Sequence, residues 1–267
     1  MVAATTRPDS YDESVAEEEA ERMALADQTT AVTQRGQWPG RITLRRGWAR
    51  AEARPWNDDE PQASLRLLRG GASFLEACSD HLLELGPVGV ISPPLPESAQ
   101  RAWSQAGYRP FVDLALMRRP LDSPPGAPDH LVVEQPNADL SDLLAIDEAA
   151  FAPFWRFNRG ALEEAIGATS RSTTLIILGS DGGPIAYAVV GFGSAIAYLQ
   201  RVAVQPEWQG QGMGRSLVRV IARKARSAGA KVLLLNTQID NHSAIRLYED
   251  EGFVQLPEPL TLLQYGG

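Results

Sequence analysis

The stretch that decides the fold reads Val202-Ala203-Val204-Gln205-Pro206-Glu207-Trp208-Gln209-Gly210-Gln211-Gly212-Met213-Gly214-Arg215-Ser216-Leu217. An apolar strand leads into a glycine-rich turn, and the turn opens a helix with apolar residues near a 3.6-residue period. Glycines allow positive φ and close approach of a phosphate, while the free N–H groups of a helix N-terminus attract an anion. With the charge of Arg215 added, the stretch predicts a site for a phosphate-bearing ligand.

Two other phosphate-binding motifs fit the same stretch less well. Gly210, Gly212 and Gly214 are spaced G-x-G-x-G rather than G-x-G-x-x-G, and no acidic residue follows at the end of the next expected strand, residues 232–237. The G-K-[ST] sequence of a Walker loop does not occur. A glycine-rich turn with a purely structural role stays open as an alternative.

A second informative stretch follows, Asn241-His242-Ser243-Ala244-Ile245-Arg246-Leu247-Tyr248-Glu249-Asp250-Glu251-Gly252-Phe253. It resembles the N-x-x-A-x-x-L-Y-x-x-x-G-F signature of the GNAT superfamily, and the first stretch resembles its acyl-CoA signature, Q/R-x-x-G-x-G/A. The resemblance covers the chain from about residue 131 onward. It implies an α/β (α+β) GNAT fold, with a mixed central β-sheet flanked by helices. It also implies an acetyl-CoA-dependent N-acetyltransferase, in which a primary amine attacks the thioester directly.

The resemblance assigns roles to individual residues. Tyr248 is implied to protonate the leaving thiolate, which a phenol with a pKa of about 10 can do at neutral pH. A helix aromatic packed into the core is the alternative for Tyr248. The strand backbone is implied to pair with the pantetheine arm, the turn to hold the pyrophosphate, and Asn241 to bond the arm. The residues implied to bind acetyl-CoA, the co-substrate, are Val202, Ala203, Val204, Gln209, Gly210, Gln211, Gly212, Met213, Gly214, Arg215 and Asn241.

The general base has no clear candidate in the sequence. The chain is similar to bacterial ribosomal-protein alanine acetyltransferases through both signatures, but those enzymes place a glutamate where this chain has Asn236. A glutamate is also common where this chain has Gln200. Neither amide accepts a proton as a carboxylate does. The base therefore stays unassigned, with candidates that are more often solvated on exposed helices: Asp147, Glu148 and Glu163.

The acceptor site is expected beside an unusually aromatic loop, residues 151–157, between the first two helices of the second unit. Phe154 and Trp155 are predicted to line an apolar pocket for a small-molecule or peptide amine, although plugging the core is an equal alternative. Arg156 and Arg159 either receive a substrate carboxylate or lie solvated on the surface. The sequence does not name the acceptor or fix the acyl-chain length.

The chain divides into four parts by composition and repetition. Residues 1–38 are predicted to be a disordered acidic tail, residues 39–119 a degenerate GNAT-like half-domain, residues 120–129 a proline-rich linker and residues 130–267 the catalytic GNAT domain. The repeat is visible because residues 98–108 match residues 243–253 without a gap. This tandem plan is similar to that of mycothiol synthase. The first copy has Trp103 at the position of Tyr248, so it is predicted to be non-catalytic.

Smaller elements of the first unit are predicted as well. Residues 42–53 are expected to be extended, residues 65–68 a strand and residues 98–106 a helix. Cys78 lies in an apolar helical pattern, and we expect its small side chain to be buried.

Composition excludes several classes of protein. A formal net charge of −8 argues against a general nucleic-acid or membrane-surface binder. No run of 18 apolar residues exists, and the acidic start is unlike a secretion signal. One cysteine with scattered histidines predicts no metal site. We expect a cytoplasmic, bacterial transferase that acts on an amine acceptor, and an internal repeat can replace a dimer partner in a monomer. The competing hypotheses are a non-catalytic acyl-CoA-binding regulatory module and a scaffold that binds no CoA.

Overall fold

The computed structural model describes residues 31–267, so residues 1–30 of the predicted acidic tail lie outside the described part of the chain. Residues 33–35, which the sequence analysis placed in that tail, instead form strand β1 (Thr33–Arg35). β1 pairs antiparallel with β2 (Ile42–Arg46), with Thr33 opposite Arg45. A segment too polar to build a core of its own thus pairs its backbone groups with β2 at the edge of the sheet.

The described strands form one mixed sheet in the order β1-β2-β3-β4-β5-β13-β6-β11-β10-β9-β8-β7, with β12 also paired to β6. The β4–β5 and β10–β11 pairs are parallel and the other pairs are antiparallel, which confirms the predicted mixed α/β architecture. The remaining strands are β3 (Ala49–Pro55), β4 (Gln62–Arg69), β5 (Gly89–Ile91), β6 (Arg109–Pro120), β7 (Val133–Glu134), β8 (Arg171–Leu178), β9 (Pro184–Phe192), β10 (Ile196–Val204), β11 (Val232–Gln238), β12 (Val254–Gln255) and β13 (Leu260–Tyr265). The α-helices are α2 (Ala72–Glu84), α3 (Arg101–Gln105), α4 (Leu140–Ala150), α5 (Arg159–Gly167), α6 (Met213–Ser227) and α7 (His242–Asp250).

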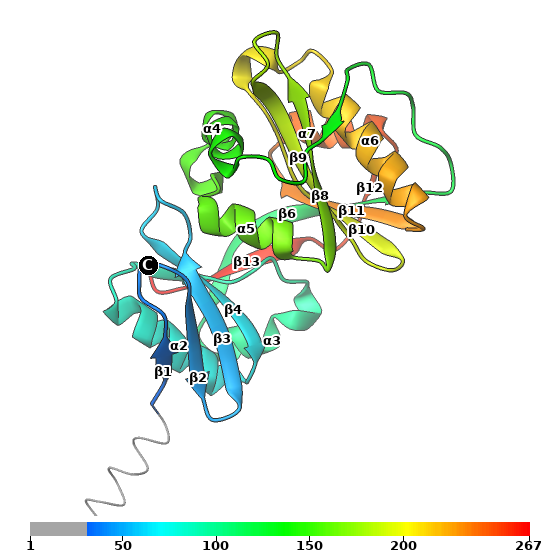
Figure 1. The fold of residues 1–267 in the computed structure, drawn as a ribbon. Helices are drawn as coiled ribbons and strands as arrows, with labels where there is room; N and C mark the ends of the chain where they lie inside the picture. The colour runs from blue at the N-terminus through cyan, green and yellow to red at the C-terminus, as the bar shows by residue number, and fades with distance from the viewer. Residues whose placement is uncertain (1–30) are drawn as a thin grey trace, which may run out of the picture.

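The two units exchange their last strands. β13, at the end of the chain, pairs with β5 of the first unit, and β6, the last strand of the first unit, pairs with β11 of the second (Figure 1). Leu263 of β13 therefore lies in the core of the first unit, and Met117 of β6 lies in the core of the second. The sequence analysis did not predict this exchange, because apolar alternation shows that a strand exists but not which strand it pairs with.

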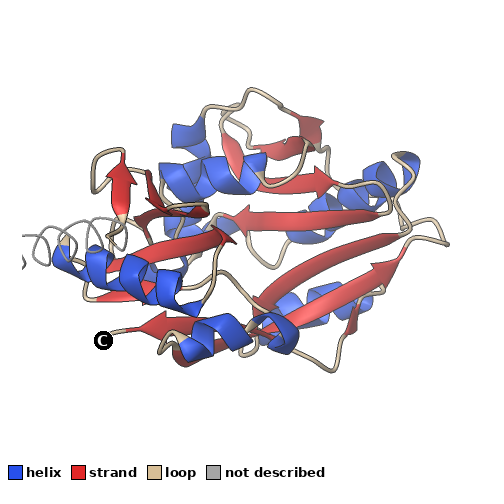
Figure 2. Cartoon of the chain, turned by 90° about the horizontal axis from the view of Figure 1, so that it is seen from below, coloured by secondary structure: helices blue, strands red, loops and turns tan. Residues whose placement is uncertain are grey.

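Helices cover both faces of the second unit's sheet (Figures 1 and 2). α6 packs on one face through residues such as Leu217 and Ile221 in the largest core cluster. α4 and α5 pack on the other face, where Leu143, Leu162 and Tyr187 form a separate core. Different helices thus cover the two faces of this part of the sheet. The site described below lies between strands of this covered part.

The first unit shows two differences from its predicted elements. Residues 42–53 form the β2–β3 hairpin rather than one extended segment, and the chain reverses at Gly47, whose φ is +58°. The expected helix over 98–106 is shorter, with a 3-10 turn at Glu97–Ala99 before α3. The predicted burial of Cys78 is confirmed, since its side chain has no exposed surface.

The proline-rich linker is tied to the second unit. The Ser216 hydroxyl accepts hydrogen bonds from the backbone N–H groups of Asp129 and His130 at 3.1 and 3.2 Å. Arginine side chains on α6 also donate to linker carbonyls: Arg219 to Ala127, Arg223 to Pro125 and Arg226 to Leu121. The segment therefore lies along α6. Between residues 31 and 267 no helix has the length and apolar character that crossing a membrane requires.

Candidate active site

The glycine-rich turn forms a cradle of free backbone donors. Within the described chain, the N–H groups of residues 210–215 have no hydrogen-bond acceptor, and the first bond of α6 runs from the Ser216 N–H to the Gly212 carbonyl. Gly210 and Gly212 have φ values of +73° and +86°, which residues with a Cβ rarely adopt. Unpaired donors at the start of a helix attract an anion through their dipoles. The turn therefore has the geometry of a phosphate site.

Strand β10 has a free edge beside this turn. β10 pairs with β11 only from Ile196 to Tyr198, and just beyond this point its pairing with β9 has a register shift between Leu199 and Arg201. Residues 201–204 keep their pairing with β9 on the other side. The edge of β10 that faces away from β9 is thus open to an extended ligand.

A cavity of about 500 Å³ joins the turn to this free edge, and we call it the cofactor cavity. Its lining includes every residue that the sequence assigned to acetyl-CoA except Gln211. The Gln211 carbonyl lies 2.8 Å from His130 Nε2, and its side chain donates to the Glu207 carbonyl, so Gln211 braces the turn. The Gln209 side chain likewise donates to the Val204 carbonyl.

Two residues assigned to the cofactor already have protein partners. Arg215 forms ion pairs with Asp250 at 2.9 Å and with Glu251 at 3.1 Å, so its charge is largely balanced. The Asn241 side-chain oxygen accepts the Ala244 N–H and caps α7. The backbone amides, rather than these side chains, are therefore the free donors of the cofactor cavity.

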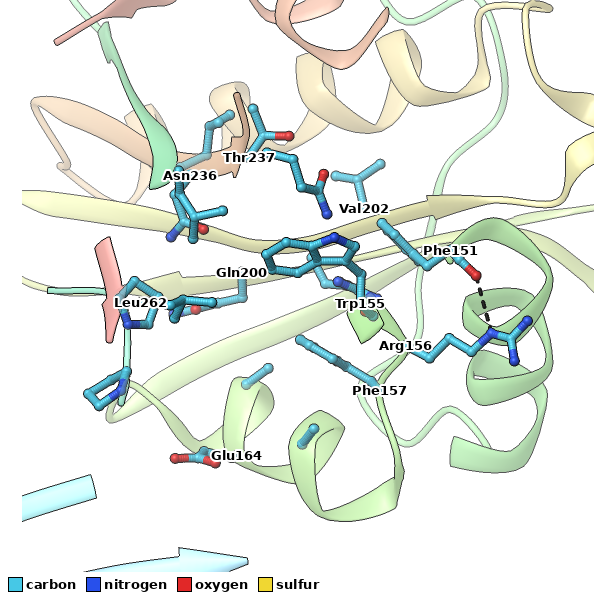
Figure 3. A pocket seen from close by; sticks show the side chains of 18 of the residues that line it. Phe151, Trp155, Arg156, Phe157, Glu164, Gln200, Val202, Asn236, Thr237 and Leu262 are labelled. Atoms are coloured by element: carbon cyan, nitrogen blue, oxygen red, sulfur yellow. Dashed lines mark hydrogen bonds between the residues drawn. The ribbon is translucent and has the colours of Figure 1, made fainter. Parts of the chain in front are cut away.

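A second cavity, of about 390 Å³, opens between β10, β11 and the aromatic loop, and we call it the acceptor cavity (Figure 3). The two cavities meet, because five residues line both of them: Phe151, Val202, Asn241, Ala244 and Tyr248. Phe154 and Trp155, predicted to line the acceptor site, both line the acceptor cavity. The structure thus brings the predicted site residues together around one junction.

Tyr248 lies at this junction, on α7. The residue is 8% exposed, and its hydroxyl makes no hydrogen bond to any residue from 31 to 267. Burial raises the pKa of Tyr248 to about 12, with Arg201 opposing the shift. The phenol is therefore protonated at neutral pH and has a proton to give.

The position of Asp147 differs from the sequence analysis, which expected a solvated helix residue and a candidate base. Its carboxylate is fully buried and receives two hydrogen bonds of 2.7 Å from Arg201, one of 2.6 Å from the Tyr187 hydroxyl and one of 2.7 Å from the Phe157 N–H. These bonds occupy the carboxylate oxygens, so Asp147 is a structural residue rather than a base. The other two candidates, Glu148 and Glu163, do not line the acceptor cavity, and Glu163 pairs with Arg159 instead.

The Asp147–Arg201 pair holds the aromatic loop in place. The Arg201 guanidinium lies 3.5 Å from the ring centre of Phe151 and 3.9 Å from that of Phe157, and it also donates to the Trp155 carbonyl. Cation–π contacts with both rings add to the buried ion pair. One guanidinium therefore positions three residues that line the acceptor cavity.

The first unit holds the same loop from the other side, which the sequence analysis did not predict. Trp56 donates to the Phe154 carbonyl at 2.7 Å and stacks on the Phe154 ring with 5.0 Å between centroids. The buried Asn57 side chain donates to the Pro153 carbonyl at 2.8 Å. These residues follow β3, about 100 positions before the loop in sequence. The sequence signal that could have identified Trp56 and Asn57 is a Trp-Asn pair in the turn between two strands.

The comparisons with known proteins agree with this geometry. The sequence profile of the acetyltransferase (GNAT) family matches residues 140–253, which include the turn, the free edge of β10 and Tyr248. Residues 140–253 are a GNAT-family domain. Mycothiol acetyltransferase of Streptomyces bingchenggensis is 30% identical over 175 residues, which cover 58% of this chain and 56% of that protein. A ribosomal-protein-alanine N-acetyltransferase of Escherichia coli is 34% identical over 76 residues, 28% of this chain and 51% of that one.

A solved structure relates the whole fold to tandem GNAT proteins. A tandem GNAT protein from the clavulanic acid biosynthesis pathway, solved without AcCoA, has a TM-score of 0.58 at 13% identity and covers 97% of both chains. The likeness shows that the two-unit fold is shared. The chain spans between 18% and 60% of the length of four mycothiol acetyltransferases that it matches.

The GNAT-family domain has amides where its acceptor cavity meets the strands. Gln200 on β10 and Asn236 on β11 both line the cavity, as Figure 3 shows. Among the described residues that line the cavity, the single acidic one is Glu164 of α5, which the sequence analysis did not select and which pairs with Arg54 at 2.8 Å. No group of three or more metal-binding side chains occurs among residues 31–267.

Proposed function

We propose that the chain is an acetyl-CoA-dependent N-acetyltransferase that acts on a primary amine of a small molecule or a peptide. One observation carries the proposal: the cofactor cavity and the acceptor cavity meet at Tyr248. The unpaired amides of residues 210–215 suit a pyrophosphate, and the free edge of β10 suits an extended pantetheine arm. A thioester that follows this path ends beside Tyr248.

The reaction needs a neutral amine and an acid. The amine attacks the thioester carbonyl, the carbon–sulfur bond breaks, and the Tyr248 hydroxyl gives its proton to the leaving thiolate. The nitrogen loses a proton to water as the amide forms, and the Tyr248 phenolate takes a proton back from water. Glu164 is held in its ion pair with Arg54, and Gln200 and Asn236 are amides, so we assign no side chain as the base. The neutral fraction of the amine in solution then sets the pH dependence of attack.

A second candidate is an acyl-CoA-binding module without turnover. The amides at Gln200 and Asn236 favour it, because no free carboxylate lines the junction. Tyr248 favours the enzyme, since its phenol lies at the junction with no hydrogen bond to a described residue. Both candidate functions predict acetyl-CoA binding, but only the enzyme predicts turnover.

Turnover with a set of primary amines separates them. Purified protein is incubated with acetyl-CoA and each amine, and free CoA is measured with a thiol reagent while mass spectrometry detects the acetylated amine. Cys78 is fully buried and burial raises the pKa of its thiol to about 12, so it contributes little signal in the folded protein. We expect CoA release coupled one-to-one to acetylated amine. Tight acetyl-CoA binding without release, for every amine, would instead favour the binding module.

A further inference from the structure

The acceptor cavity extends to the first unit, and two arginines of that unit line this end of the cavity. Arg54 on β3 and Arg66 on β4 alternate with the buried residues Ala53 and Leu65, so they lie on the sheet face opposite the first unit's core. This face is turned toward α5 of the GNAT-family domain, where Glu164 pairs with Arg54. In Figure 1, α5 lies next to β3 and β4. The first unit is thus part of the cavity wall.

The charged groups in the cavity lining do not balance. Arg156 is paired with Asp59, and Arg201 is paired with the buried Asp147. Arg54 pairs with Glu164, and Arg66 pairs with Glu52, a carboxylate that it shares with Arg50 and Arg41. Four guanidinium groups beside this end of the cavity thus face two carboxylates, which leaves an excess of positive charge around Arg66.

Arg54 is largely committed within the protein. Its Nε donates to Glu164 at 2.8 Å and its Nη1 donates to the carbonyls of Pro55 and Trp56, both at 2.8 Å. These contacts neutralise Glu164 and fix the Arg54 guanidinium.

Arg66 has donors to spare. Its Nη2 donates to Glu52 at 3.1 Å, its Nη1 is 3.9 Å from Glu164, and its buried Nε has no hydrogen-bond partner among the described residues. The Nη1 group, which makes no hydrogen bond to a described residue, can donate one charge-assisted hydrogen bond to a carboxylate oxygen.

We propose that the acceptor is an amine that also carries a carboxylate, with the carboxylate bound by Arg66 of the first unit and the amine at the junction beside Tyr248. The inference rests on the proposed function and adds the substrate class to it. The aromatic side chains of Trp56 and Trp155 also line the cavity and suit an apolar spacer in the acceptor. The first unit then selects the acceptor while the second unit holds the acetyl donor.

The test compares ω-amino acids of increasing chain length with the matching ω-amino amides, which have the same amine and spacer without the charge. Turnover is followed by CoA release, and binding is followed by calorimetry with CoA present. For the best spacer length, we expect the acid to exceed the amide in kcat/KM by about tenfold or more, the size of one charge-assisted hydrogen bond. Matching ω-amino alkyl phosphates show whether the site takes any anion or selects a carboxylate.

Two variants locate the effect. Arg66→Gln should reduce the preference for the acid over the amide to about twofold or less, while acetyl-CoA affinity stays unchanged. Arg69→Gln, on the same strand, exposed and outside the cavity lining, should keep the wild-type preference. The comparison of acid with amide cancels any general loss of stability, because both substrates are measured on the same protein.

Several results would overturn the inference without touching the proposed function. Equal use of acids and amides by the wild type, an unchanged preference in Arg66→Gln, or acids that neither bind nor react would each do so while acetyl-CoA still bound. A preference for phosphates over acids would replace the carboxylate with a phosphate. Loss of acetyl-CoA binding in the wild type would instead overturn the proposed function itself.

Discussion

The Tyr248→Phe variant is expected to lose about a hundredfold to ten-thousandfold in kcat, the usual contribution of a positioned general acid. The substitution removes the hydroxyl and keeps the ring that packs against Phe253, so the fold should be preserved. Acetyl-CoA affinity should change little, because the free donors of the cofactor cavity are the backbone amides of residues 210–215. Steady-state kinetics and calorimetry on the same preparation measure both quantities.

The pH profile of the wild type provides an independent check. Burial raises the pKa of Tyr248 to about 12, and a general acid is active while protonated, so its contribution is lost only as pH rises through that value. The wild-type kcat/KM should therefore rise with the neutral fraction of the amine in solution, and kcat should show no falling limb up to about pH 10, near the ordinary pKa of tyrosine. A fall in kcat that begins at neutral pH, or a Tyr248→Phe variant with wild-type kcat, would contradict the assignment.

The Asp147→Ala variant is expected to lower the free energy of unfolding by about 3–5 kcal/mol, because it leaves a charged partner buried without its counterion. The Arg201 side chain is 10% exposed and donates two hydrogen bonds to Asp147, and the Tyr187 hydroxyl and the Phe157 N–H would lose their acceptor as well. Urea denaturation followed by circular dichroism measures the change.

Glu163→Ala provides the matched control for this loss. Glu163 also pairs with an arginine, Arg159, but both side chains are more than half exposed. An exposed pair of this kind contributes about 0–1 kcal/mol. If Asp147→Ala and Glu163→Ala had similar effects, the Asp147–Arg201 pair would not be the structural centre of the aromatic loop.

The parts of the site that could be predicted are those in which residues close in sequence form one structural feature. The glycine turn at residues 210–215 and Tyr248 on α7 lie within two short signatures, and local backbone geometry explains why those residue types are needed. The structure brings them to one junction, although binding and catalysis at that junction stay predictions. The mixed sheet was predicted from the GNAT resemblance that these two signatures carry.

The unpredicted part depends on contacts between distant residues. Asp147 has the sequence pattern of a helix-surface acid, and its burial results from Arg201 and Tyr187 on neighbouring strands. The exchange of β6 and β13 leaves no trace in either strand's own pattern. Arg66 looks like any polar residue on an alternating strand, and only the packing of the first unit against α5 brings it to the acceptor cavity. Residue type and spacing do not show which distant residues come into contact in the fold.

The most direct test of the central claim is calorimetric titration with acetyl-CoA of the wild type, Gly212→Glu and Gly229→Glu. Both glycines have positive φ, +86° and +90°, so the backbone strain of the substitution is matched. A Cβ at Gly212 would meet only His130 Nε2, at 3.6 Å, and a Cβ at Gly229 would meet nothing within 4 Å. Gly212 lines the cofactor cavity and Gly229 does not, so only a carboxylate at 212 would oppose the pyrophosphate. We predict binding by the wild type and by Gly229→Glu, and loss of binding by folded Gly212→Glu. Equal binding by all three proteins, or none by the folded wild type, would contradict the account.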